Sequence, residues 1–144
     1  MKFTDPKKLQ AHLDKRATTI AKKNVVNVVT RATMMVQNTA KKSISKGGTG
    51  QLYQKYEPRR SHRASAPNQP PATDTGFLIS QITMDVDVKT NGSVVGQIIS
   101  SAPYSKALEY GTTNMTARPF MQPALQKNKR KIENLFKKGI LKWV

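Results

Sequence analysis

A chain of 144 residues is long enough for one ordinary domain, and the absence of cysteine excludes disulfide bonds and thiolate metal sites. No apolar run approaches the roughly 18 residues of a membrane span, so the sequence predicts no membrane partner and no secretory signal. The net charge of +17 favours binding to polyanions or to acidic protein surfaces.

The excess positive charge lies toward the two ends of the chain. Residues 1–46 carry 11 Lys and Arg against 2 Asp and Glu, and residues 119–144 carry 7 against 1. Residues 78–118 are balanced, with 3 of each sign. The sequence therefore predicts a nearly neutral centre with basic flanks.

The N-terminal flank predicts a long amphipathic helix. An Asp-Pro pair at residues 5–6 is typical of a helix start, and a Gly-Gly pair at residues 47–48 is typical of a helix end. Between these pairs, apolar residues return at steps of three and four from Leu9 to Ile44, while lysines make much of the other face basic.

Residues 47–76 predict a long, basic, proline-rich loop. They are poor in apolar residues and contain four prolines, and Arg59, Arg60 and Arg63 lie close together near their middle. A connection of more than about 15 residues inside a compact domain is normally functional or disordered. Composition leaves two alternatives open: a floppy surface excursion, or a loop that becomes ordered against a neighbouring subunit.

Residues 78–101 predict a β-hairpin. Apolar and polar residues alternate through its first half, which is the period of a half-buried strand. The Asn91-Gly92 pair favours a type I′ turn, and with these two as the turn residues Val88 faces Val95.

The rest of the chain predicts two helices and one further strand. Residues 104–110 carry apolar residues at helical spacing, and Gly111 suits the left-handed position that ends a helix. Pro119 is typical of a first helical position, so a final helix is expected from there to Gly139. Because a two-stranded ribbon is marginal alone, a third strand is expected near residues 115–117.

Together these elements predict a single α+β domain over residues 1–144. Its small antiparallel sheet would be packed with the long N-terminal helix and the C-terminal helix. The apolar face of the final helix contains a polar Asn128, and Trp143 is a candidate for a core or subunit contact.

Two stretches resemble a known family. In residues 102–125, APYSKALEYGTTNMTARPFMQPAL, a tyrosine is followed by Glu-aromatic-Gly-Thr, Arg-Pro-Phe and Pro-Ala. This order resembles the neck and tail-completion proteins of long-tailed bacteriophages, which are small head–tail connector subunits. Residues 62–82, HRASAPNQPPATDTGFLISQI, resemble the family's proline-rich loop before its first strand, with Asn68 where glycine is expected.

The resemblance implies a structural virion protein of the phage neck, without enzymatic activity and without a cofactor. Such a protein would form a homo-oligomeric ring that completes the tail and joins it to the head around the DNA path. A hexamer is preferred and a dodecamer is the alternative. The implied partners are neighbouring connector or head-closure proteins and tail-tube or tail-terminator proteins, and the implied location is the virion, after assembly in the host cytoplasm.

The charged and aromatic residues of the two stretches and of the basic loop are the candidates for subunit or partner contacts. Glu109 and Arg118 either pair with each other, pair across a subunit boundary, or stay solvated. Phe120 and its neighbouring tyrosines are expected in core or interface packing. The candidate interface residues are Arg59, Arg60, Arg63, Tyr104, Glu109, Tyr110 and Arg118.

The alternative function is a basic nucleic-acid-binding protein that contacts the phosphate backbone. The sequence contains no zinc pattern, phosphate loop or aromatic stacking series for reading bases. The candidate contacts to DNA or to acidic surfaces are Lys22, Lys23, Lys41, Lys42, Lys129, Arg130, Lys137 and Lys138.

Catalytic and metal sites find little support in the sequence. The only histidines are His12 and His62, and their spacing brings no serine and acid together with them. Asp85 and Asp87 point to one face of the predicted strand, but a divalent cation requires more hard ligands than this segment offers. An enzyme whose site carries no sequence signal remains the third class.

Overall fold

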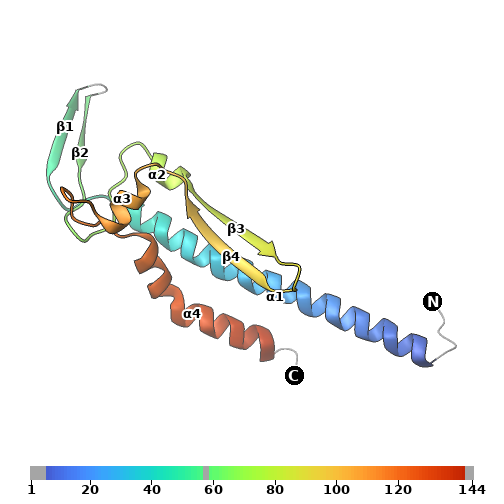
Figure 1. The fold of residues 1–144 in the computed structure, drawn as a ribbon. Coiled ribbons are helices and arrows are strands. Elements are labelled where there is room, and N and C mark those ends of the chain that lie inside the picture. The colour runs from blue at the N-terminus through green and yellow to red at the C-terminus, as the bar shows by residue number, and fades with distance from the viewer. Residues whose placement is uncertain (1–5, 57–58, 142–144) are drawn as a thin grey trace.

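The computed structural model describes residues 6–56 and 59–141, whose elements follow the order α1, β1, β2, α2, β3, β4, α3, α4 (Figure 1). A long N-terminal helix, two small antiparallel sheets and a C-terminal helix form an α+β fold, which confirms the predicted class. Asp5 and Trp143, for which the sequence predicted a helix cap and a docking contact, lie outside the described residues.

Helix α1 (Pro6–Ser45) is one uninterrupted helix of 40 residues. It ends before Gly47, whose φ of 81° is the left-handed conformation that closes many helices. Its N-terminal half extends beyond the strands and α4 (Figure 1), and every side chain from Leu13 to Lys23 is exposed. The predicted amphipathic stripe is therefore buried only in its second half, while Leu13 and Ile20 remain 49% and 43% exposed.

Strands β3 (Ile82–Val88) and β4 (Val94–Ser100) form the predicted hairpin, but their register differs from the prediction by one residue. Val88 lies opposite Val94 instead of Val95. The apolar face of β3 still packs against α1: Ile82 is fully buried and belongs to the same cluster as Val36 and Ala40 of α1. The other face of the ribbon carries the strand's aspartates.

The turn of this hairpin explains the difference in register. The backbone N–H of Lys89 donates to the Ser93 carbonyl at 2.9 Å, and Gly92 N–H donates to the Lys89 carbonyl at 2.9 Å. Gly92 has a φ of 82°. The loop is therefore a three-residue turn that ends in a left-handed glycine, and not the predicted two-residue type I′ turn. Both turn types use an Asn-Gly pair, so the pair alone did not distinguish them.

The core lies between the second half of α1, the β3–β4 ribbon and the start of α4. Strand β4 approaches α1 so closely that a Cβ atom at Gly96 would lie 2.1 Å from Thr33 Oγ1. Ile44, Ile82 and Phe120 are the largest fully buried side chains. The whole buried cluster consists of Val36, Ala40, Ile44, Leu78, Ile82, Ala102, Phe120 and Ala124.

Helix α4 (Met121–Leu141) runs antiparallel to α1 (Figure 1). It starts two residues after Pro119 and continues past Gly139, so both predicted ends are wrong by two residues. Gly139 lies inside the helix where α4 crosses α1, and a Cβ atom there would lie 2.7 Å from Val28 Cγ2. A larger residue at this point would therefore require the Val28 side chain to shift.

A second hairpin occupies part of the segment predicted as a loop. Strands β1 (Leu52–Tyr56) and β2 (Arg59–Arg63) pair in antiparallel register and project from the rest of the fold (Figure 1). Gly50 N–H donates to the Ala64 carbonyl at 2.8 Å and so closes the base of the hairpin. The prediction of a loop is wrong over these residues because the strands are mostly exposed and therefore lack the alternation of apolar residues that marks a buried strand.

Two further predictions about the sheet are corrected. The first three residues of the predicted strand, residues 78–80, lie in a helical turn, α2 (Phe77–Ser80), with the buried Leu78 on it. In place of a third strand, the described chain near residues 115–117 has only an isolated bridge between Thr112 and Met115.

Candidate functional site

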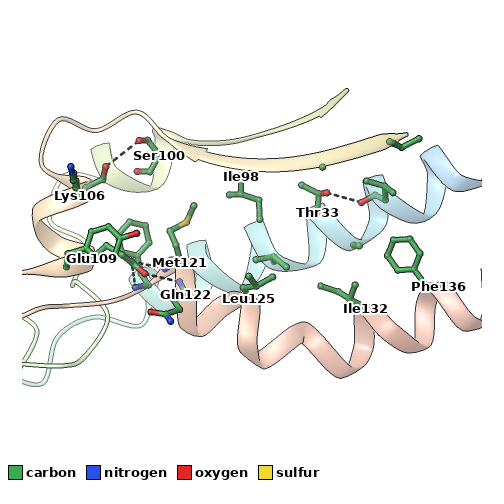
Figure 2. Close-up of a pocket in the computed structure, with 18 residues that line it drawn as sticks. Thr33, Ile98, Ser100, Lys106, Glu109, Met121, Gln122, Leu125, Ile132 and Phe136 are labelled. Carbon is green, nitrogen blue, oxygen red and sulfur yellow. Dashed lines mark hydrogen bonds between the residues drawn. The ribbon is translucent and has the colours of Figure 1, made fainter. Parts of the chain in front are cut away.

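The two stretches that carry the family resemblance meet around the short helix α3 (Ser105–Tyr110). The carboxylate of Glu109 accepts hydrogen bonds from three backbone N–H groups at the start of α4. The distances are 2.8 Å to Phe120, 3.0 Å to Met121 and 2.9 Å to Gln122 (Figure 2). These are N–H groups that a helix start leaves without intrahelical partners, and a negative charge is favourable there.

The chain between the two helices is folded tightly. Gly111 has φ 78° and ψ 179°, a backbone conformation that is essentially limited to glycine. A Cβ atom at this position would also lie 2.8 Å from the Met115 carbonyl oxygen. Arg118 N–H then donates to the Leu108 carbonyl at 2.6 Å, which returns the chain to α3. Gly111 therefore ends α3 with a positive φ as predicted, but its ψ is extended and not that of the predicted left-handed helical conformation.

The proline-rich segment 64–75 packs against the same place. Asn68 has a φ of 61°, and its N–H donates to the Ala117 carbonyl at 2.9 Å. Asparagine is one of the few residues other than glycine that adopts this conformation readily, so it serves where the family pattern has glycine. The rings of Phe77 and Tyr104 are 6.2 Å apart with a 42° tilt and join the two stretches again.

Arg118 does not pair with Glu109, because the Glu109 carboxylate is bound to the start of α4. Within the part of the chain that the structure describes, the Arg118 side chain makes no hydrogen bond and no ion pair. Its Nε is buried and lacks a partner. It lines a pocket of about 260 Å³ between residues 62–78 and α3.

A larger groove of about 660 Å³ lies between β4 and α4, and residues of α1 form its floor. In Figure 2, Ile98 from β4 and Ile132 and Phe136 from α4 face the same space. Leu125 on its rim is 54% exposed. The groove is therefore an apolar surface that the described part of the chain leaves uncovered.

The remaining candidate residues are distributed over the surface. Tyr104 and Tyr110 are 44% and 75% exposed, whereas Phe120 is 1% exposed and belongs to the core. Arg59 and Arg63 are exposed on β2, the same strand that contains Arg60. Of the candidate basic residues of α1 and α4, Lys41 is half-buried and the others are exposed: Lys22, Lys23, Lys42, Lys129, Arg130, Lys137 and Lys138.

Sequence reasoning missed two polar residues of this region. Ser65 is 4% exposed and lines the pocket of Arg118, but no periodicity or motif singled it out. The capping role of Glu109 was also missed, since its partners are 11 to 13 residues away. Asn128 was noticed as a polar interruption, and the structure shows it 4% exposed, donating 2.8 Å hydrogen bonds to Thr39 Oγ1 and the Ala124 carbonyl.

The described residues contain neither a metal-ligating cluster nor a membrane-spanning helix. Among the described residues, no group of three His, Cys, Asp or Glu could hold a metal ion. Asp87 instead pairs with Lys89 at 2.8 Å, and this hydrogen bond raises the pKa of the exposed Lys89 amine. Over residues 6–56 and 59–141, no helix combines the length and apolar character of a membrane span.

Comparison of the chain with protein-family models, with curated proteins and with solved structures gives no match.

Proposed function

We propose that this chain is a structural subunit of the neck of a long-tailed bacteriophage, forming a ring that completes the tail and joins it to the head around the DNA path. The proposal rests on the contact between residues 62–82 and residues 102–125. These stretches resemble that protein family separately, and in the fold they bind each other through the Asn68–Ala117 hydrogen bond and the contact of Phe77 with Tyr104. The resemblance thus coincides with one structural unit.

The surface of the chain supports assembly with other copies. Apolar side chains remain exposed on the projecting half of α1, in the groove beside α4 and on the β1–β2 hairpin, where Tyr56 is 79% exposed. Monomeric proteins rarely leave contiguous apolar patches of large size uncovered. The three regions differ from one another, which suits the heterologous contacts of a closed ring. Six copies are preferred because phage tails are six-fold, and twelve are the alternative.

The charge distribution supports partners with acidic surfaces. The net charge is +17, and the basic side chains of α1 and α4 are mostly exposed. Neighbouring connector or head-closure rings and tail-tube or tail-terminator rings would supply the complementary surfaces. The function involves docking and geometry without a reaction, so no cofactor is needed.

Electron microscopy and native mass spectrometry of the purified full chain test the proposal directly. A closed ring of six or twelve copies is the expected result. A second test removes the gene from the phage that encodes it, where separate heads and tails are expected to accumulate and to join when purified protein is added. A protein that stays monomeric in solution and is absent from purified particles would contradict the proposal.

A nucleic-acid-binding function is the second candidate, favoured by one observation. The eight candidate lysines and arginines lie on the two antiparallel helices, and none of them forms an ion pair with another described residue. Such side chains are available to phosphate groups, with an affinity that falls steeply with salt.

A further inference from the structure

Two residues that line one small pocket each contain a buried polar atom without a hydrogen-bond partner. Ser65 and Arg118 both line the cavity of about 260 Å³ between residues 62–78 and α3, and the unpaired atoms are the Ser65 hydroxyl and the Arg118 Nε. Ser65 is 4% exposed. Buried polar groups in folded proteins are nearly always paired, so two unpaired groups in one cavity indicate that it receives a polar ligand or ordered water.

The charges around the pocket leave Arg118 uncompensated. Asp74 is the one acidic residue among the lining side chains, and it forms an ion pair with Lys55. His62 Nδ1 also lies 3.9 Å from Asp74 Oδ1. The guanidinium of Arg118 is always protonated and has no counter-ion in the described chain. A ligand that binds it would therefore be an anion.

The fold holds Arg118 in place from both sides. Its N–H donates to the Leu108 carbonyl at 2.6 Å, and the carbonyl of the preceding Ala117 accepts the hydrogen bond from Asn68. Pro119 follows directly and fixes its own φ. These contacts fix the backbone of Arg118, and so they fix the point from which its side chain extends.

We propose that this pocket binds a carboxylate group, with the Arg118 guanidinium and the Ser65 hydroxyl as hydrogen-bond donors. The planar fork of arginine matches the two oxygens of a carboxylate. The volume of about 260 Å³ lies below the range of about 300–1,000 Å³ that is typical of small-molecule pockets, so a group of side-chain size fits. The Asp74 carboxylate in the same wall disfavours a doubly charged phosphate.

The carboxylate comes either from a small free acid or from an aspartate or glutamate side chain of a docking protein. The two sources share the chemistry of recognition and differ in how much of the ligand the protein contacts. The proposal of a carboxylate site follows from the pocket alone, and its test does not depend on assembly into a ring.

The test follows the Arg118 Nε–H signal by NMR in the full ¹⁵N-labelled chain, with Arg118→Lys used to assign the signal. Sodium acetate is titrated against sodium chloride at equal ionic strength. Acetate is expected to shift the Arg118 signal saturably and chloride to leave it in place. Ser65→Ala should weaken acetate binding roughly tenfold, because a hydrogen bond to a charged group is lost. Arg31→Lys, an exposed arginine on α1, is the matched control and should change nothing.

A second arm compares short peptides that differ only in carrying one Glu or one Gln. Binding of the Glu peptide at concentrations well below those needed for acetate assigns the site to a protein side chain, whereas equal concentrations assign it to a free acid. An Arg118 signal that responds to neither acetate nor the Glu peptide, or that responds equally to chloride, overturns the proposal and leaves water as the partner of both groups.

Discussion

The carboxylate of Glu109 accepts a hydrogen bond from the backbone N–H of Phe120 at 2.8 Å, and this contact makes α3 the cap of α4. It joins the Glu-aromatic-Gly-Thr motif to the Arg-Pro-Phe motif, which are separate in the sequence. Since Phe120 is 1% exposed, the same contact places a core side chain and the first turn of α4 together. The Glu109 carboxylate therefore holds α3 against the start of α4.

Replacing Glu109 by Ala should lower the free energy of unfolding by about 2 kcal/mol, because three backbone N–H groups lose a charged acceptor. Glu109→Gln should cost about half as much, since one acceptor oxygen remains. Urea denaturation followed by circular dichroism measures both. Glu133→Ala on the exposed face of α4 is the control. Equal effects of the changes at Glu109 and Glu133 would contradict the capping role.

The Asn128–Thr39 hydrogen bond predicts a difference between two substitutions in the α1–α4 interface. Asn128→Ala leaves a buried cavity and should cost about 2 kcal/mol. Asn128→Leu refills the volume, and the Thr39 hydroxyl still donates to the Met35 carbonyl at 2.8 Å, so stability should stay near that of the natural chain. Chemical denaturation checks both. The exposed Asn134→Ala is the control, and equal losses for Ala and Leu would show that the hydrogen bond itself supplies the stability.

The close approach of β4 to α1 predicts that Gly96→Ala is destabilising, by about 1–3 kcal/mol, because the new Cβ atom would overlap Thr33 Oγ1. Thr33→Ala in the same chain should recover part of the loss. It should not recover all of it, since Val29 Cγ1 would still lie 2.9 Å away. A double-mutant cycle measured by thermal unfolding gives the coupling between the two sites. Gln97→Ala on the outer face is the control, and additive effects at Gly96 and Thr33 would contradict the contact.

The long elements could be predicted because their apolar residues repeat with the period of a buried face. The helix over residues 6–45 and the hairpin around Asn91-Gly92 follow from this rule. The register of the hairpin could not be predicted, because two turn types use the same Asn-Gly pair. Strands β1 and β2 could not either, since exposed strands bury too few side chains to leave a pattern in the sequence.

The candidate site was only partly predictable for a different reason. Glu109 and Arg118 were singled out as the charges of one motif, but their partners are set by how the chain folds back at Gly111. A buried, unpaired group such as Ser65 has no sequence signature at all. Contacts between distant segments decide the role of each of these residues, and spacing along the chain does not encode them.

The next prediction concerns the arginines of the β1–β2 hairpin. Replacing Arg59, Arg60 and Arg63 by Ala should leave the fold intact, because the strands lie outside the core. If the chain is the proposed neck subunit, phage carrying this triple variant should produce heads and tails that fail to join, as counted by electron micrographs of lysates and by infectious titre.

A matched control for the hairpin variant removes three positive charges elsewhere. Lys15, Arg16 and Arg31 are exposed on α1, and their replacement by Ala should leave joining intact if the position of the charges decides. Normal joining by the hairpin variant would remove the proposed role of β2. Failure of both variants would point to total charge as the cause.

Contact with DNA predicts a dependence on salt. The purified chain should shift duplex DNA in a gel, and its affinity should fall by orders of magnitude between about 50 and 200 mM salt if six or more phosphates are contacted. Lys137 and Lys138 are exposed in the last turns of α4, and replacing both by Gln should reduce the slope of log affinity against log salt by about 1.8, since each phosphate contact contributes about 0.9. The hairpin triple variant should keep the original slope. If the natural chain gives no shift at 50 mM salt, DNA contact is contradicted, and the basic helices are then left to acidic protein surfaces, because a phosphate-binding face of this charge would be strongest at low salt.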